Sequence, residues 1–131
     1  MPVVSDFVTI VGDQNIQIGD NINESGWTKQ FNTGGRWSGG SAFISFMVRG
    51  MIQTLDNAKV FVNDVEVGVL FNNDGGHERH WNTQTVSLAG SQLKDGQNTL
   101  RVEPVTNKKK LGGDYDDYHL RNVICHFHQQ A

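Results

Sequence analysis

The stretch AKVFVNDVEVGVL, residues 58 to 70, constrains the fold more than any other part of the chain. Asn63 and Asp64 tolerate the positive φ angles of a tight two-residue turn, and apolar residues alternate with others on both sides of them. With these two residues in the turn, three apolar pairs face each other: Val62 with Val65, Val60 with Val67, and Ala58 with Val69. The pattern predicts a β-hairpin whose valine side packs on a core.

Apolar residues recur with a period of two along most of the remaining chain, in short segments separated by turns rich in Gly and Asn. Segment 41–52 is apolar on both faces and is expected in the middle of a sheet, and a bulge is expected near Asn122. No segment has a helical period. These features predict an all-β fold, an antiparallel β-sandwich of the jelly-roll type with about eight or nine strands. The expected strands lie within 3–11, 15–18, 27–31, 41–52, 58–71, 81–88, 98–105 and 118–128.

The length of 131 residues suits a single jelly-roll β-sandwich domain over residues 1–131. A formal net charge of −3 gives no electrostatic basis for binding nucleic acid or an acidic membrane. The chain as given shows neither a signal peptide nor an apolar run long enough to span a bilayer. Its one cysteine, Cys125, excludes an internal disulfide and lies in an apolar pattern typical of a buried thiol.

Three pieces within residues 60–103, VFVNDVEVGVL, WNTQTVSL and LKDGQNTLRVE, resemble the galactose-binding-domain-like jelly rolls, a superfamily with many carbohydrate-binding modules. In that superfamily a Leu-Lys-x-Gly-x-Asn-x-Leu turn recurs before a strand, and a closing strand similar to DDYHLRNVIC follows. The resemblance covers roughly the C-terminal half of the chain. It implies the jelly-roll fold, whereas activity is less defined because the scaffold hosts binding, interaction and a few catalytic domains.

The same resemblance implies a structural Ca²⁺ ion near the first and last strands, where Asp6 and Asp117 are the matching positions. The run Asp114, Asp116 and Asp117 is also similar to the acidic loop of calcium-dependent bacterial lectins, in which the metal bridges to sugar hydroxyls. Clustered carboxylates and backbone carbonyls supply the oxygen ligands that calcium needs. The alternative is a solvated acidic turn balanced by the lysines at 108–110, and both interpretations stay open here.

Two tryptophans and one polar loop are the candidate sugar contacts. Trp37 lies between Gly pairs, where an exposed ring would stack on a pyranose; the alternative is a ring that plugs one end of the sandwich. Trp81 opens a strand, either as a second stacking surface or as part of the core edge. The hydrogen-bonding candidates are Asn73, Asp74, His77, Glu78 and Arg79 of the loop 72–80, and Tyr115 of the acidic loop completes the ligand-binding set.

Three hypotheses for function follow. The first is a non-catalytic, lectin-like carbohydrate-binding domain, calcium-dependent, with loops 32–40, 72–81 and 107–118 forming the site at one end or on one concave face. The second is a structural or assembly domain that acts by self-association or protein contacts, because segments 41–52 and 118–128 are apolar on both faces. The third is a small metalloenzyme using His126 and His128, which share a face but lack a following carboxylate. No recognisable catalytic motif is present, so an enzyme is not expected.

Overall fold

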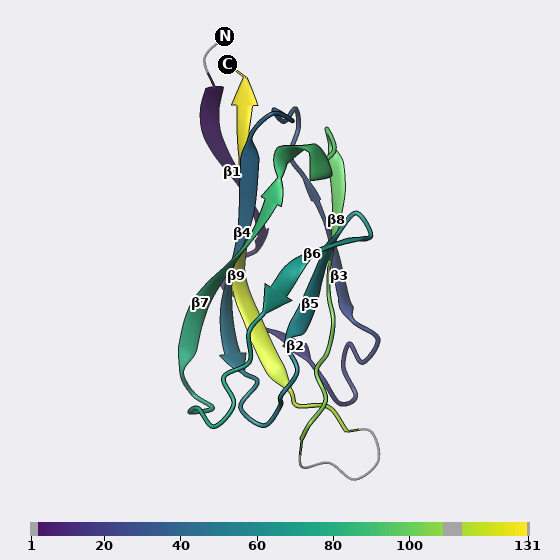
Figure 1. Cartoon of the computed structure of the whole chain (residues 1–131), viewed down its shortest axis with the longest axis vertical. Helices are drawn as coiled ribbons and strands as arrows, with labels where there is room; N and C mark the ends of the chain where they lie inside the picture. The colour runs from purple at the N-terminus through teal and green to yellow at the C-terminus, as the bar shows by residue number, and fades with distance from the viewer. Residues whose placement is uncertain (1–2, 109–113, 131) are drawn as a thin grey trace.

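The computed structural model describes residues 3–108 and 114–130 and places them in two antiparallel sheets that pack face to face (Figure 1). One sheet has the order β1-β9-β4-β7, with β2 also paired to β9, and the other has the order β3-β8-β5-β6. The predicted all-β jelly-roll sandwich is confirmed. The strands of the described residues are β1 (Val3–Val11), β2 (Ile16–Ile18), β3 (Trp27–Asn32), β4 (Ser41–Gly50), β5 (Ala58–Val62), β6 (Val65–Leu70), β7 (Trp81–Ala89), β8 (Gln97–Val102) and β9 (Tyr118–Gln130), and a short 3-10 turn spans Gly90–Gln92.

The core lies between the two sheets and is built from alternate residues of each strand. On β4 the inward residues Ile44, Phe46 and Val48 are almost completely buried. The opposite sheet contributes its inward residues in the same way, and Leu93 closes the core beneath the turn before β8, as expected. Removing each such side chain from water stabilises the fold by about 1.5–3 kcal/mol. The period-two pattern therefore identifies the core face of most strands correctly.

The β5–β6 hairpin has the predicted turn, since Asn63 and Asp64 have φ angles of 51° and 66°. Val62 pairs with Val65 as expected, but the register then shifts by one residue. Val60 lies opposite Gly68 rather than Val67, and Ala58 lies opposite Leu70 rather than Val69. The predicted pairing was therefore wrong beyond the first pair. An extra residue in β6 forms a bulge that the alternating sequence does not reveal.

The bulge also changes which side chains reach the core. Val65 is 51% exposed, so the valine side of the hairpin does not pack on the core along its whole length. Gly68 instead turns toward the other sheet, where a side-chain carbon at its position would approach Cγ1 of Val86 to 2.7 Å. Glycine is therefore the residue that lets β6 come close to β7.

Strand β9 runs the length of its sheet and pairs with β1, β2 and β4. The expected bulge is present at Asn122, whose φ angle is 50°. Val3 pairs with Gln130, so the two ends of the chain lie together at the end of the sandwich where β9 finishes (Figure 1). The start of β9 lies at the other end, beside the end of β4 and several loops.

Cys125 is buried on β9, and burial raises the pKa of its thiol to about 12. Among the described residues, no helix has the length and apolar character needed to cross a membrane.

Candidate functional site

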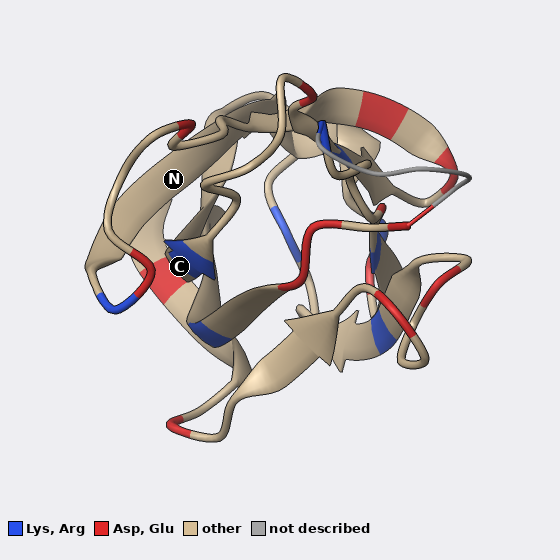
Figure 2. Ribbon diagram, turned by 90° about the horizontal axis from the view of Figure 1, so that it is seen from below, with Lys and Arg blue, Asp and Glu red and all other residues tan. Residues whose placement is uncertain are grey.

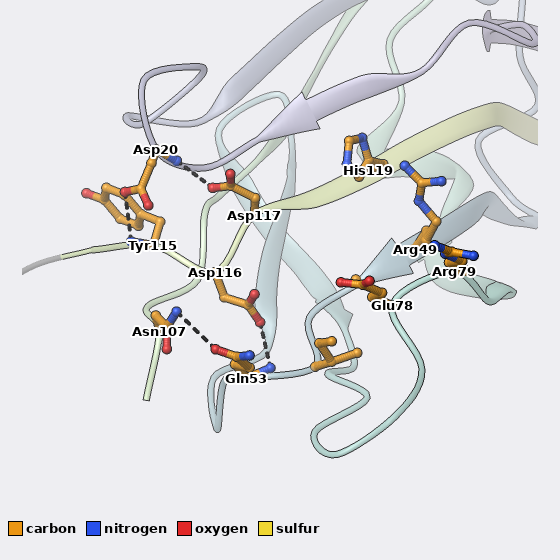
Figure 3. Close-up of a pocket in the computed structure, with 12 residues that line it drawn as sticks. Asp20, Arg49, Gln53, Glu78, Arg79, Asn107, Tyr115, Asp116, Asp117 and His119 are labelled. Atoms are coloured by element: carbon orange, nitrogen blue, oxygen red, sulfur yellow. Dashed lines mark hydrogen bonds between the residues drawn. The ribbon is translucent and has the colours of Figure 1, made fainter. Parts of the chain in front are cut away.

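A cavity of about 550 Å³ opens at the end of the sandwich where β4 finishes and β9 starts (Figure 3). Figure 2 views this end and shows acidic and basic segments interspersed around it. The lining comes from the loop after β2, the end of β4 and the loop after it, the β6–β7 loop, the β8–β9 loop and the start of β9. Its residues are Asp20, Arg49, Gly50, Ile52, Gln53, Glu78, Arg79, Asn107, Tyr115, Asp116, Asp117 and His119.

One side of the cavity carries three carboxylates that backbone amides hold in place. Oδ1 of Asp117 accepts a hydrogen bond from the amide of Asp20 at 2.7 Å, and Oδ1 of Asp20 accepts one from the amide of Tyr115 at 3.0 Å. Oδ2 of Asp116 accepts from the amide of Gln53 at 2.9 Å. These bonds tie the β2, β4–β5 and β8–β9 loops to one another. The carboxylates are consequently preorganised acceptors with few alternative orientations.

Two glycines allow this arrangement around Asp117. At Gly19, with a φ angle of 156°, a side-chain carbon would overlap the Asp117 carboxylate. At Gly50, with a φ angle of 107°, a side-chain carbon would lie 2.9 Å from the carbonyl oxygen of Asp117 and from Cα of Tyr118. Both positions therefore require glycine for close approach of the chain.

Asp116 is the most buried of the three acids, with 8% of its surface exposed. Burial raises the pKa of its carboxyl group above the usual value, and the nearby negative charges of Asp117 and Asp74 act in the same direction. The hydrogen bond from the Gln53 amide opposes this rise because it stabilises the ionised form. A carboxyl group with a perturbed pKa in a cavity is a typical component of a functional site.

The other side of the cavity carries Arg49, Arg79 and His119, with Glu78 close to the two arginines in Figure 3. Within the described part of the chain, neither Arg49 nor Arg79 belongs to an ion pair shorter than 4.0 Å. Nδ1 of His119 is buried and has no hydrogen-bond partner among those residues. Burial, followed by the charge of Arg49, lowers the pKa of His119 and favours its neutral form. This side therefore offers hydrogen-bonding groups that are still available to a ligand.

The cavity brings together five of the residues predicted from sequence: Glu78, Arg79, Tyr115, Asp116 and Asp117. Trp81 lies just outside it, with the guanidinium of Arg121 4.0 Å and that of Arg49 5.1 Å from its ring centroid. Arg49 also lines the cavity, so Trp81 is linked to the cavity through its contact with this arginine.

The remaining residues of the loop 72–80 do not line the cavity. Asp74 forms an ion pair with Lys108 at 2.6 Å, and His77 stacks on His80 with ring centroids 4.4 Å apart. Asn73 lines a separate hollow beside Phe71. Of the candidates in this loop, only Glu78 and Arg79 line the cavity.

Trp37 lies at the opposite end of the sandwich. Its amide donates a hydrogen bond to the carbonyl of His128, near the end of β9, and its half-buried indole packs along Gly39 and Gly40. The structure therefore does not bring Trp37 to the cavity of Figure 3. The loop 32–40 therefore lies at one end of the sandwich, and the described residues of the loops 72–81 and 107–118 lie at the other. The three loops do not form the single site that the sequence predicted.

The predicted calcium ligands are also divided between the two ends. Asp6 pairs with Phe127 late in β9, whereas Asp117 directly precedes that strand. Asp114 is exposed beside the cavity but does not line it. In 3–108 and 114–130 no group of three His, Cys, Asp or Glu side chains is close enough to hold a metal ion. Lys109 and Lys110, named as possible balancing charges, lie outside the described residues.

Sequence reasoning missed Asp20, Arg49, Gln53 and His119, which belong to four separate segments. Arg49 carried a usable signal, since it is a charged residue at the end of an otherwise apolar strand. His119 occupies the equivalent place at the start of β9. The pairing of Arg49 with His119 is what brings them together, and an isolated sequence does not specify that register.

No protein-family model and no curated protein matches the chain. Among solved structures, it is similar to BpGH86A, a β-porphyranase of glycoside hydrolase family 86 from the human gut bacterium Bacteroides plebeius, with a TM-score of 0.65 and 15% identity over 98% of this chain and 21% of that one. It is also similar to a family 35 carbohydrate-binding module from Clostridium thermocellum, with a TM-score of 0.55 and 16% identity over 93% of this chain and 98% of the module.

A third similar structure is the CBM36-1 domain of a multidomain xylanase from the hindgut metagenome of Trinervitermes trinervoides, with a TM-score of 0.51 and 9% identity over 98% of both chains. The chain thus spans about a fifth of the porphyranase and nearly all of the two modules. At these identities the likeness concerns the fold alone. The resemblance inferred from residues 60–103 is confirmed at that level: the chain shares the β-sandwich fold of these two carbohydrate-binding modules.

Proposed function

We propose that this chain is a non-catalytic carbohydrate-binding domain that holds a sugar in the cavity at the start of β9. The observation that carries the proposal is the convergence of fixed acceptors and available donors in one cavity. Asp20, Asp116 and Asp117 lie on one side, and Arg49 and Arg79 lie on the other.

Sugar hydroxyls suit such a lining because each hydroxyl both donates and accepts hydrogen bonds. The carboxylates accept from a hydroxyl, and the guanidinium groups donate to its oxygen. The volume of about 550 Å³ falls within the usual range for small-molecule sites. Tyr115 is half-buried at the same wall and provides an aromatic surface beside the polar groups.

Binding rather than catalysis is supported by the state of the carboxylates. Asp20, Asp116 and Asp117 each accept a hydrogen bond from a backbone amide, which fixes them as recognition groups. The shared fold with two carbohydrate-binding modules, over at least 93% of this chain, supports the same proposal.

Calcium is not part of the proposed binding step. Oδ1 and Oδ2 of Asp117 already accept from the Asp20 amide and from Nε2 of Gln17, and Asp6 lies near the far end of β9. The described residues therefore do not bring together Asp6 and Asp117, the two positions matched to a structural ion. Dependence on calcium stays a prediction of the sequence, and sugar binding should be measured both with calcium and with a chelator.

The proposal is tested by screening the chain on a glycan array that includes neutral, carboxylated and sulfated oligosaccharides, followed by calorimetry on the hits. Glu78→Gln and Arg79→Gln are suitable variants because both side chains are exposed and tolerate substitution. Loss of a hydrogen bond to a charged group costs about 1.5–3 kcal/mol, so we expect affinity to fall roughly tenfold or more in each.

Matched controls are Glu66→Gln and Lys59→Gln, whose side chains face each other across the β5–β6 hairpin, with a 4.0 Å separation between Nζ and Oε1. Both should bind like the wild type. Absence of any glycan ligand, with and without calcium, would overturn the proposal, as would equal affinity of the cavity variants and the wild type.

A further inference from the structure

A second cavity, of about 290 Å³, lies on the outer face of the β1-β9-β4-β7 sheet, close to its other end. Its walls come from β1, β4 and β9. Its lining includes the aromatic rings of Phe7, Phe43 and His126 and the polar side chains of Ser5, Ser41 and His128, beside Asp6 and Phe127.

The aromatic group is a row across three adjacent strands. His126 pairs with Phe7 of β1 on one side and with Phe43 of β4 on the other. The His126 and Phe43 rings are stacked, with centroids 4.4 Å apart and 16° between their planes, and the centroids of Phe7 and His126 are 6.4 Å apart. Phe7 is 63% exposed and Phe43 is 40% exposed. The row therefore presents apolar ring surface to solvent at a position that the core does not require.

The neighbouring polar groups are suited to hydroxyl recognition. Oγ of Ser45 lies 3.3 Å from Nε2 of His126, and Oγ of Ser5 lies 3.5 Å from Nδ1 of His128. A neutral imidazole has one donor and one acceptor nitrogen, and a hydroxyl both donates and accepts. An exposed ring next to such groups matches the apolar C–H face and the hydroxyls of a pyranose.

The two cavities lie along the same pair of strands. On β4, Arg49 lines the first cavity and Phe43 lines the second, while on β9 His119 lines the first and His126 the second. All four point to the outer face, since Arg49 pairs with His119 and Phe43 with His126. Phe43 and Arg49 are six positions apart on β4, which corresponds to about 20 Å along a strand.

We propose that the second cavity is an additional sugar subsite and that one polysaccharide chain occupies both cavities by running along the outer face of this sheet. The inference rests on the proposed function of the first cavity. Between the cavities the face carries the hydroxyls of Ser45, Thr83 and Thr85, and the two threonines are exposed. The ligand class is therefore an oligosaccharide or polysaccharide long enough to bridge the cavities, rather than a single terminal sugar.

A second copy of the chain is the other candidate occupant, and the observations favour it less. A stable protein interface buries roughly 1,200–2,000 Å², far more than two exposed phenylalanine rings supply. The rings also border a concave hollow with serine and histidine groups rather than a flat apolar face. Polar groups that surround an aromatic wall in a small cavity are typical of a small-ligand site.

The test uses calorimetry with monosaccharides and hexasaccharides of the agarose, xylan, mannan and β-glucan series. The variants are Phe43→Ala and Phe7→Ala, with Phe71→Ala as the matched control because Phe71 is 64% exposed and lines neither cavity. If two linked sites act together, we expect the hexasaccharide affinity to fall roughly tenfold or more in the Phe43 and Phe7 variants. The control should bind like the wild type, and Phe43→Trp should retain affinity because it preserves an aromatic surface.

Unchanged hexasaccharide affinity in both Phe43→Ala and Phe7→Ala would overturn the second subsite, and if Arg79→Gln still lost affinity the function proposed for the first cavity would stand. A wild type that binds no sugar of these series would overturn the shared path for one polysaccharide, whereas the function proposed for the first cavity is decided by the wider glycan array. Sedimentation velocity provides an independent check: a wild-type dimer that Phe43→Ala converts to a monomer would assign this face to a second copy of the chain and overturn the sugar subsite.

Discussion

Nδ2 of Asn63, in the β5–β6 turn, donates a hydrogen bond to Oδ1 of Asn98, at the start of β8, with 2.9 Å between the two atoms. Asn98 is almost completely buried, and its amide also contacts the turn before β8 by donating to the carbonyls of Lys94 and Gly96. Oδ1 of Asn98 accepts from the Lys94 amide at 2.7 Å as well. One side chain thereby joins two turns of the same sheet. This accounts physically for the asparagine of the Leu-Lys-Asp-Gly-Gln-Asn segment.

Asn98→Ala is expected to lower the free energy of unfolding by about 3 kcal/mol, because it leaves several buried polar groups without partners. The measurement is urea denaturation followed by circular dichroism. Asn15→Ala, at an exposed position, should change the free energy by less than about 0.5 kcal/mol. Equal stability of the two variants would contradict the assigned role of Asn98.

Gly50→Ala is expected to destabilise the protein by roughly 1–3 kcal/mol, because the residue adopts a positive φ angle and its new methyl group would press on the backbone at Asp117 and Tyr118. The same substitution at Gly12 meets no atom within 4 Å and serves as the control. Thermal denaturation of both variants measures the difference in their stability. A Gly50 variant as stable as the Gly12 variant would show that the approach of β9 to this turn is not tight.

Asp116→Asn is expected to raise the stability of the protein at neutral pH. The folded protein raises the pKa of Asp116, so it binds the proton more strongly than the unfolded chain does. The stabilising contribution of Asp116 is therefore fully present at pH values below its pKa in the unfolded chain, near 3.8. It is lost as the pH rises through the higher pKa of the folded protein. Asparagine carries no charge and avoids that loss.

The stability gain of the Asp116 variant should accordingly be small near pH 3.5 and larger near pH 7, as measured by thermal denaturation at several pH values. Asp64→Asn, in the exposed hairpin turn, controls for the removal of one negative charge. A variant less stable than the wild type at neutral pH would indicate that the ionised carboxylate stabilises the fold.

Tyr118→Phe is expected to reduce stability by about 1 kcal/mol, because the buried hydroxyl donates to the carbonyl oxygen of Glu103 at 2.6 Å and that acceptor would lose its partner. Chemical denaturation gives the value. Tyr115→Phe provides the comparison, since it removes a hydroxyl from a half-buried ring of the cavity wall. If the Tyr115 variant were the less stable one, the acidic loop rather than the β8–β9 contact would limit stability.

Local chemistry explains which parts of the structure could be predicted from sequence. Asn63 and Asp64 specify their turn because both accept positive φ angles, and alternation places Ile44, Phe46 and Val48 in the core. The bulge opposite Val60 could not be predicted from the sequence of β6. Valine occupies every second position of this strand, at 65, 67 and 69, so the alternation shows no break where the extra residue lies.

The candidate site was only half predicted, for a topological reason. Glu78 and Arg79 belong to a loop that is visible as a polar segment, whereas Arg49 and His119 become neighbours through the pairing of β4 with β9. The antiparallel pairing of β1 with β9 likewise separates Asp6 from Asp117, because the first residues of β1 lie beside the last residues of β9. Strand register decided these outcomes, and single residues carry little information about it.

The pairing of Val3 with Gln130 determines which end of the sandwich faces a tag or a support joined to the chain. A tag, a solid support or a fused polypeptide joined at either end emerges on the side away from the Asp117 cavity, which then remains oriented toward the surrounding medium (Figure 1). The hollow beside Phe7 and His128 lies close to that attachment point and is the one that a bulky fusion would shield. Immobilised and free forms of the protein should consequently differ in their relative affinities for long and short ligands.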